Sequence, residues 1–128
     1  MQTSNHQHSE LTDKVIGAFY TVYNKLGHGF LENVYENALS IELTKIGLEV
    51  QTQVAIKVYY DEVEVGNYFA DMLINDTVIL ELKAVEHVLP SHEAQLQNYL
   101  QAVPLDVGLL LNFGVQPVVK RRTRRVKL

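Results

Sequence analysis

Three ionisable residues near the middle of the chain, Asp71, Glu81 and Lys83, lie in segments that otherwise read as apolar strands. Strands of this composition are normally buried, and a buried charge is costly unless it is paired or binds a metal ion. Two carboxylates that face each other across a strand pair repel, so a cation must neutralise them. Carboxylate oxygens suit Mg²⁺ or Mn²⁺ better than zinc, which prefers histidine and cysteine. Asp71 and Glu81 are therefore candidate catalytic metal ligands, and Lys83 could orient water or stabilise charge on a phosphate.

The spacing of these residues sets a condition on the loop between the two strands. Side chains alternate along a strand, so Glu81 and Lys83 share one face. A three-residue loop at 75–77 places Asp71 opposite Glu81, whereas a two-residue loop without a bulge turns Asp71 away. The chemistry therefore predicts an odd loop or a bulge. The alternative is an edge hairpin in which the three side chains are solvated or form an ordinary salt bridge.

The order Asp-x9-Glu-x-Lys after an amino-terminal helix resembles the motif of the PD-(D/E)XK nuclease superfamily. Ala70 stands where the superfamily often has a proline before the aspartate. The resemblance extends from about Leu11 to Gly114 and implies an α/β fold, a restriction-endonuclease-like mixed sheet flanked by helices. It also implies a nuclease or nuclease-like phosphodiesterase that uses Mg²⁺ or Mn²⁺ and acts on nucleic acid, with DNA expected ahead of RNA.

Gly29, Glu32 and Tyr35 match the GxxExxY motif that names one small bacterial family of this superfamily. Many members of that family have no assigned activity, so the match implies a nuclease-like fold without a defined substrate. By the resemblance, Glu32 would be a third metal ligand, because the superfamily commonly has a glutamate from an early helix there. The helix dipole explains an acidic residue in a first helical turn equally well. Tyr35 is expected to pack rather than to catalyse.

Apolar periodicity indicates the elements that must position these side chains. Apolar residues recur at steps of three and four over 10–26 and 31–45, which predicts two helices. Gly27 ends the first helix, and the second should turn Val34, Ala38, Leu39 and Ile41 toward the core. Strands are expected over 49–60, 63–65, 107–111 and 115–119. On the first of these, three polar residues read as solvent-facing groups without a chemical role: Gln51, Gln53 and Lys57.

A third helix is predicted over 91–102, with Ser91 as its cap after Pro90. Gln95 and Tyr99 are one turn apart on this helix and so share a face. This Gln-x3-Tyr pattern resembles one found after the Glu-x-Lys strand in many superfamily nucleases, where it shapes the active site and contacts the nucleic-acid backbone. The resemblance makes Gln95 a candidate catalytic residue and Tyr99 a candidate substrate-binding residue. The alternative is that Tyr99 packs in the core while Gln95 bonds to a neighbouring backbone group.

Charge is distributed unevenly along the 128 residues, whose formal net charge is −4. Six of the 11 basic residues lie in the segment 120–128, which has no acidic residue, so the rest of the chain carries a charge of −10. Arg121 and Arg122 in this basic segment are candidate substrate contacts, because phosphate neutralisation is the main sequence-independent term in nucleic-acid binding. The alternative is a solvated tail, or a tail that docks on an acidic face of a second subunit.

Length and composition predict a single domain, 1–128, with 1–9 as a flexible leader. The chain has no cysteine, which excludes disulfides, thiolate nucleophiles and cysteine-based metal sites. No apolar run is long enough for a transmembrane helix and no signal-peptide pattern is present, so a cytoplasmic protein without a membrane partner is expected. Cutting both strands of a duplex with one small domain would require a homodimer. The alternative function is a non-catalytic binding or assembly module, which the acidic body favours because it repels nucleic acid.

Overall fold

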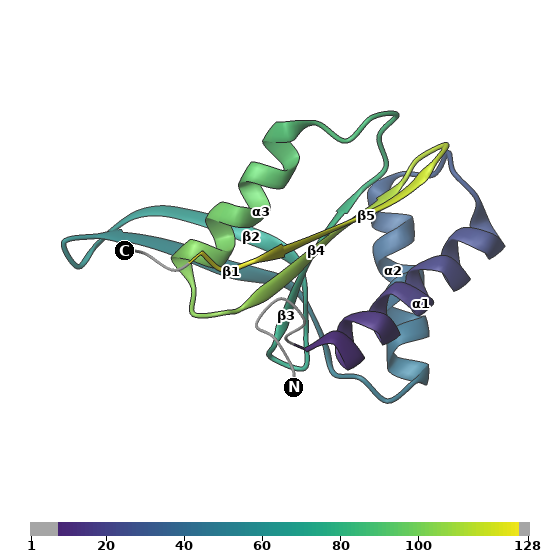
Figure 1. Ribbon diagram of the computed structural model, residues 1–128, viewed down its shortest axis with the longest axis horizontal. Helices are drawn as coiled ribbons and strands as arrows, with labels where there is room; N and C mark the ends of the chain where they lie inside the picture. Colours follow the sequence, from purple (N-terminus) through teal and green to yellow (C-terminus); the bar gives the residue numbers. More distant parts are fainter. Residues whose placement is uncertain (1–7, 126–128) are drawn as a thin grey trace.

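The computed structural model describes residues 8–125 and shows a five-stranded mixed sheet with helices on both faces (Figure 1). The elements in chain order are α1 (Ser9–Leu26), α2 (Glu32–Lys45), β1 (Val50–Tyr60), β2 (Val63–Ile74), β3 (Val78–Lys83), α3 (Pro90–Ala102), β4 (Val107–Phe113) and β5 (Pro117–Thr123). The strands follow one another in the order β1-β2-β3-β4-β5. Only β3 and β4 are parallel, and α3 connects them. The predicted α/β fold with a mixed sheet and flanking helices is confirmed.

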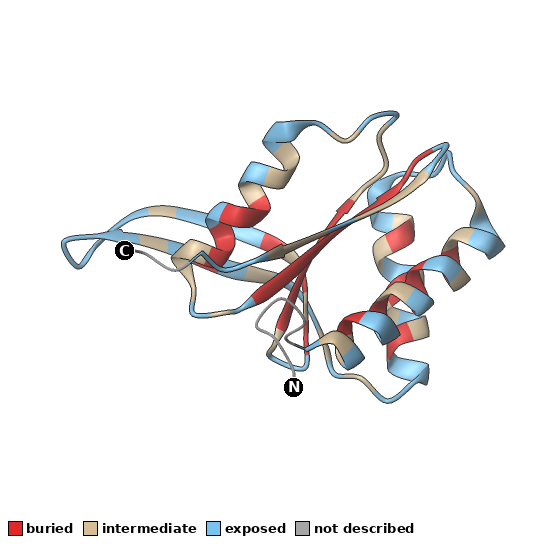
Figure 2. Cartoon of the chain, in the orientation of Figure 1, coloured by how far each residue is buried: buried red, intermediate tan, exposed pale blue. Residues whose placement is uncertain are grey.

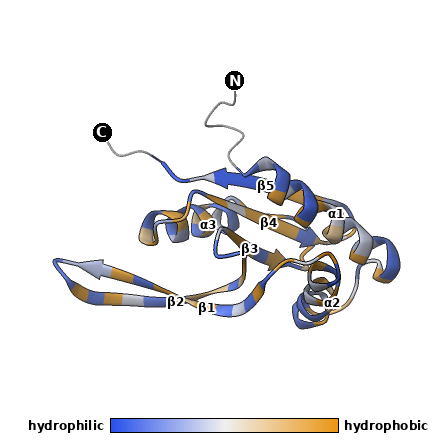
Figure 3. Ribbon diagram, turned by 90° about the horizontal axis from the view of Figure 1, so that it is seen from below, coloured by the Kyte–Doolittle hydropathy of each residue, from blue (hydrophilic) through white to orange (hydrophobic). Residues whose placement is uncertain are grey.

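The two faces of the sheet carry separate cores. On one face, α1 and α2 cover Met72, Leu80 and Leu82. On the other face, α3 packs over Ile56 and Ile79. All of β4 is buried (Figure 2), whereas the outer strand β5 is largely hydrophilic (Figure 3). Alternate residues of β3 thus face different helices, which sets Glu81 and Lys83 on the α3 side of the sheet.

β1 and β2 form a long hairpin that projects beyond the rest of the molecule (Figures 1 and 3). Its ladder is interrupted where Gln53 would pair with Asp71, and Gln53 has a φ of 52°, which a non-glycine residue seldom adopts. Met72, on one side of the interruption, belongs to the core under α1 and α2. Ala70, on the other side, belongs to the core under α3 although it has the same parity. The two faces of β2 therefore exchange at Asp71.

The loop between β2 and β3 has the predicted odd length. Residues 75–77 separate the strands, and the ladder pairs Ile74 with Val78 and Met72 with Leu80. Asn75 fixes the turn, since its Oδ1 accepts the Glu49 backbone N–H at 2.7 Å. Extended by one residue, this register places Glu81 opposite Asp71.

Two details of the helices differ from the predictions. Ile41 is 61% exposed, because the buried face of α2 runs in steps of four through Tyr35, Leu39 and Leu43 instead. Ser91 is not the cap of α3; the helix begins one residue earlier, at Pro90, after Leu89. There the Leu89 backbone N–H donates to His92 Nδ1 at 3.0 Å.

The last strand runs to Thr123, so the first part of the basic segment 120–128 is strand β5 rather than a tail. The predicted leader 1–9 lies outside the described residues except for positions 8 and 9, and α1 already begins at Ser9. Residues 126–128 also lie outside them. Within residues 8–125, no helix is long and apolar enough to cross a membrane.

Candidate active site

Asp71 and Glu81 bind each other's strand where the β2–β3 ladder ends. The Asp71 backbone N–H donates to Glu81 Oε1 at 3.1 Å, and the Leu82 backbone N–H donates to Asp71 Oδ2 at 2.7 Å. Carboxylates thus take the place of backbone carbonyls at this point of the hairpin. Each carboxylate accepts a backbone N–H with one of its oxygens, and the remaining lone pairs of a carboxylate can still bind a ligand.

Glu32 reaches this region because the loop before α2 is fixed by Tyr35. The buried Tyr35 hydroxyl donates to the Gly27 carbonyl at 2.6 Å and accepts the Phe30 backbone N–H at 3.2 Å. Its ring is stacked on Phe113 with 4.3 Å between the centroids. The three GxxExxY residues thus act together: the glycine allows the turn, the tyrosine anchors it, and Glu32 becomes the first residue of α2.

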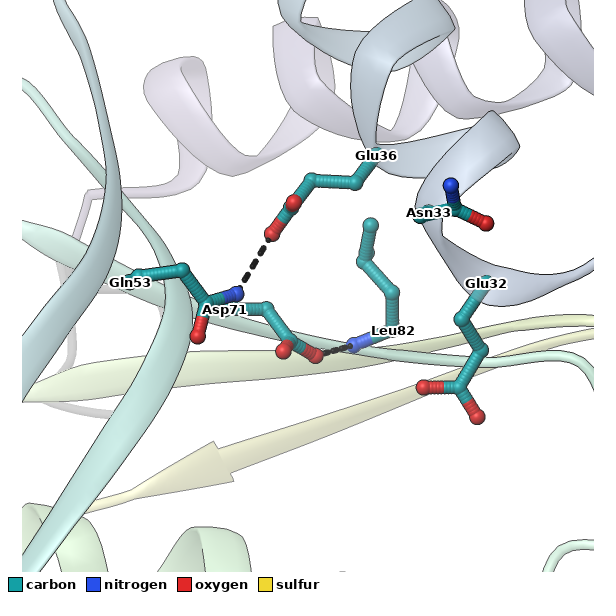
Figure 4. Close-up of a pocket in the computed structure, with 6 residues that line it drawn as sticks. All are labelled: Glu32, Asn33, Glu36, Gln53, Asp71 and Leu82. Atoms are coloured by element: carbon teal, nitrogen blue, oxygen red, sulfur yellow. Dashed lines mark hydrogen bonds between the residues drawn. The ribbon is translucent and has the colours of Figure 1, made fainter.

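A pocket of about 220 Å³ lies between α2 and the interruption of the β1–β2 ladder at Gln53 and Asp71. Its lining residues are Glu32, Asn33, Glu36, Gln53, Asp71 and Leu82 (Figure 4). Gln53 Nε2 donates to Glu36 Oε1 at 2.9 Å, and the Gln53 side chain also bonds to Asp71. Gln53 therefore connects a carboxylate of α2 to one of β2.

Glu36 and Gln53 are site residues that the sequence prediction missed. Glu36 had a usable signal, because it lies one helical turn after Glu32 and so shares its face. Gln53 had none: its parity on β1 predicted a solvent-facing side chain, and only the left-handed backbone at this residue gives it a second partner across the hairpin. Backbone strain of this kind is found preferentially at functional sites.

The carboxyl groups of Glu36, Asp71 and Glu81 resist ionisation. Burial, and next the negative charge of Asp71, raise the pKa of Glu81 from 4.5 to about 8. Burial also raises the pKa of Asp71, against the opposing effects of the Leu82 N–H and the Lys83 charge. The pKa of Glu36 is raised by burial and by the charges of Asp71 and Glu32. Such a cluster of oxygens favours a cation, because a positive charge would relieve their mutual repulsion.

Lys83 lies at the end of β3, where a polar clamp holds the chain that follows it. The buried Asn112 side chain bonds to both backbone groups of Val85, accepting its N–H and donating to its carbonyl, each at 3.0 Å. Gly114 allows this approach, since a Cβ atom there would come within 2.8 Å of the Asn112 amide nitrogen. The clamp thereby fixes the end of the strand that carries Glu81 and Lys83.

Gln95 and Tyr99 lie on the α3 side of the sheet. Gln95 Nε2 donates to Tyr99 Oη at 2.8 Å, so the predicted shared face of the two residues is observed. Tyr99 is 5% exposed and belongs to the core of that face. Burial, and next the charge of Glu81, raise the pKa of Tyr99 to about 12. Tyr99 therefore lies close enough to Glu81 for the charge of that carboxylate to raise its pKa. It does not line the pocket under α2.

The two arginines predicted to contact substrate are on β5, beyond β4 as seen from the carboxylates. Arg122 forms an ion pair with Glu93 of α3 at 3.0 Å. Arg121 donates to Thr12 Oγ1 of α1 at 3.5 Å. Glu32 and Asp71 therefore line one pocket, and Asp71 and Glu81 bond to each other's strands, with the charge of Lys83 opposing the rise in the pKa of both. The two arginines lie on another part of the surface.

No group of three or more acidic or histidine side chains within the described residues is arranged as a ready metal site. The chemistry of the donors nevertheless fits Mg²⁺ or Mn²⁺, since all of them are carboxylates. The raised pKa values of Asp71 and Glu81 indicate that a positive charge beside these carboxylates would be favourable. The exposed side chain of Glu32 lines the same pocket as Asp71.

Comparisons with known proteins agree with this arrangement. The sequence profile of the PD-(D/E)XK nuclease superfamily matches residues 9–126. The fold is similar to the crystal structure of SSO0001, with a TM-score of 0.55 at 17% sequence identity. That match covers 97% of this chain and 63% of the other, so this chain spans less than two thirds of its length. No curated protein sequence matches the chain.

Proposed function

Because the chain belongs to the PD-(D/E)XK nuclease superfamily, we propose that it is a metal-dependent nuclease that hydrolyses phosphodiester bonds of nucleic acid. One observation carries the proposal: the Asp71 and Glu81 carboxylates meet where β2 leaves β3, each bound to the other's strand. Lys83 lies on the same face of β3 as Glu81. Two carboxylates and a lysine in this order are the parts that metal-assisted phosphodiester hydrolysis needs.

The proposed roles follow from where each side chain lies. Asp71, Glu81 and Glu32 would hold Mg²⁺ or Mn²⁺, which when bound supplies polarisation of a phosphate oxygen and a more acidic water. Lys83 would orient the attacking water or stabilise the negative charge of the transition state. Gln95 would line the site through its bond to Tyr99.

The finer assignments are part of the same proposal. Gly29, Glu32 and Tyr35 support membership of the GxxExxY family, because they form one anchored unit before and within α2. DNA stays the expected substrate ahead of RNA, and a cytoplasmic location and a homodimer stay predictions. Arg121 and Arg122 would contact phosphates away from the cleaved bond, and Arg122 would have to leave Glu93 to do so.

The test is cleavage of labelled single- and double-stranded DNA and RNA with Mg²⁺ and with Mn²⁺. We expect Asp71→Asn and Lys83→Ala each to lower the rate by about 10²-fold or more, the usual effect of removing one stabilising group. Asp61→Asn, in the turn between β1 and β2, and Lys14→Ala, on α1, are matched controls that should cleave normally. Cleavage by the wild type that survives Asp71→Asn would refute the proposed site.

The second candidate is a binding or assembly module that keeps the fold without cleavage. It is favoured by one observation, the charge of −10 on the chain outside 120–128, which would repel a phosphate backbone. Calorimetry separates the two functions: a nuclease should bind Mn²⁺ in a manner that requires Asp71 and Glu81. A chain that binds nucleic acid but no Mg²⁺ or Mn²⁺ would be the binding module.

A further inference from the structure

A second pocket lies on the α3 face of the sheet, between α3 and the projecting hairpin. It has a volume of about 450 Å³, within the range of about 300–1,000 Å³ that small ligands use. We call it the aromatic pocket, and its lining residues are Val58, Tyr68, Gln95, Asn98, Tyr99 and Ala102. The pocket under α2 shares none of these residues.

Two tyrosine rings form the walls of the aromatic pocket. The rings of Tyr68 and Tyr99 lie with their centroids 6.0 Å apart and their planes inclined by 41°. Gly66 makes room for the first ring, since a Cβ atom there would lie 3.2 Å from Tyr68 Cε2 and 3.5 Å from Val58 Cβ. Tyr68 is 49% exposed, so part of this residue is accessible to a ligand. A flat aromatic ligand is the natural partner of such a surface.

Two amide side chains add polar groups to these walls. Gln95 uses its amino group on the Tyr99 hydroxyl, which leaves its carbonyl oxygen as an acceptor. Asn98 is exposed one helical turn before Ala102 and offers both a donor and an acceptor. Amides of this kind pair with the edges of nucleobases, which carry donors and acceptors beside each other.

The aromatic pocket is next to the candidate catalytic carboxylates. Tyr68 precedes Asp71 by three strand residues, a distance of roughly 10 Å. Tyr99 belongs to the same buried cluster as Ala70, the neighbour of Asp71. A base close to the cleaved bond could therefore enter the pocket while its phosphate lies at the carboxylates.

Charge on this part of the surface favours stacking over phosphate contacts. Lys57 of the hairpin is paired with Glu64 at 3.6 Å, and Arg122 is paired with Glu93. Each of these basic side chains would have to leave its carboxylate partner to neutralise a phosphate, whereas stacking on an aromatic ring contributes about 1–3 kcal/mol per base. Affinity near the site should therefore depend on bases that are free to stack.

We propose that the aromatic pocket binds an unpaired nucleobase of the strand held at Asp71 and Glu81, so that the substrate is single-stranded or locally unpaired nucleic acid. A paired base cannot enter, because its edge and both faces are occupied within the duplex. This inference rests on the proposed nuclease function.

The test uses a single-stranded DNA oligonucleotide that contains one 2-aminopurine, with EDTA present to prevent cleavage. Stacking on tyrosine should quench its fluorescence, and Tyr68→Ala should weaken binding about 5- to 100-fold. Tyr68→Phe keeps the ring and should bind like the wild type. Tyr20→Ala is the matched control, because Tyr20 is 40% exposed but lies on α1, on the opposite face of the sheet. An oligonucleotide with an abasic site in place of the base, and the annealed duplex, should both bind more weakly.

The result separates this inference from the proposed function. The proposed base binding would be overturned by any of three results: wild-type affinity in Tyr68→Ala, absence of quenching, or equal binding of the duplex. Asp71-dependent cleavage would still support the nuclease in each case. Base binding that requires Tyr68, without any metal-dependent cleavage, would refute the nuclease and leave the pocket as the binding site of a non-catalytic module.

Discussion

Replacing Glu81 by glutamine should stabilise the metal-free protein at alkaline pH. The pKa of Glu81 lies near 8 rather than 4.5 because of burial and the Asp71 charge, so the fold favours the protonated carboxyl. At 1.36 kcal/mol per unit of pKa, the difference is worth up to about 5 kcal/mol. This contribution is complete below about pH 4.5, declines as the pH rises, and is lost above about pH 8. Glutamine resembles the protonated acid and can still accept the Asp71 N–H.

The measurement is the free energy of unfolding in urea with EDTA, at pH 5 and at pH 8.5. Wild type and Glu81→Gln should be about equally stable at pH 5, and the variant should be more stable by several kcal/mol at pH 8.5. Glu49→Gln, an exposed carboxyl on the approach to β1, is the control and should show no such change. An equal difference between wild type and Glu81→Gln at both pH values would refute the assignment of the charge penalty to Glu81.

Addition of Mn²⁺ should reverse the ranking. An ion that binds only the folded protein stabilises it by about 2.7 kcal/mol at a concentration one hundred times its dissociation constant. The wild type should gain this stabilisation at pH 8.5, whereas Glu81→Gln lacks a charged ligand and should gain much less. Equal stabilisation of both proteins would show that Glu81 does not hold the metal.

Three further predictions concern the supports of the site. Tyr35→Phe removes both hydroxyl bonds to the loop before α2 and should cost about 1–3 kcal/mol in urea unfolding and weaken Mn²⁺ binding in calorimetry; unchanged Mn²⁺ affinity would contradict the anchoring role. Asn112→Ala leaves both Val85 backbone groups without their partner and should cost about 2–4 kcal/mol by the same assay. Glu93→Gln frees Arg122 and should strengthen nucleic-acid binding a few-fold in fluorescence anisotropy, with a salt dependence steeper by about one; an unaltered salt dependence would exclude Arg122 from substrate binding.

The pairing of Asp71 with Glu81 was predictable because strand parity is a strict rule. Alternation along β3 predicted the face of the strand on which Glu81 lies. The length of the loop at 75–77 then determined whether Asp71 lies opposite Glu81. Helix periodicity was equally informative for α1, whose buried residues Val15, Phe19 and Val22 lie at the expected steps. In both cases the information is local, so the sequence contains it.

Gln53 and Ile41 show where local rules stop. Gln53 is exposed as parity predicted, but its left-handed backbone interrupts the β1–β2 ladder and lets its side chain bond to Glu36 and Asp71, which parity did not predict. Ile41 is apolar but exposed, because α2 buries only the face that carries Tyr35, Leu39 and Leu43. Both outcomes depend on how α2 sits against the hairpin, and single-sequence periodicity contains no information on that packing.

The change of faces at Asp71 explains why the β1–β2 hairpin contributes to both cores of the molecule. On one side of the interruption, Met72 and Ile74 belong to the core under α1 and α2. On the other side, Ile56 and Ala70 belong to the core under α3. At the same point the β2–β3 ladder ends, and carboxylates accept the Asp71 and Leu82 N–H groups that would otherwise be unpaired. The acidic pair is therefore part of the hairpin's structure as well as a candidate metal site, and substitution by a side chain that cannot accept these bonds should disturb both. Asparagine and glutamine, which keep an acceptor oxygen, are for that reason the replacements that can separate the chemistry of the site from its fold.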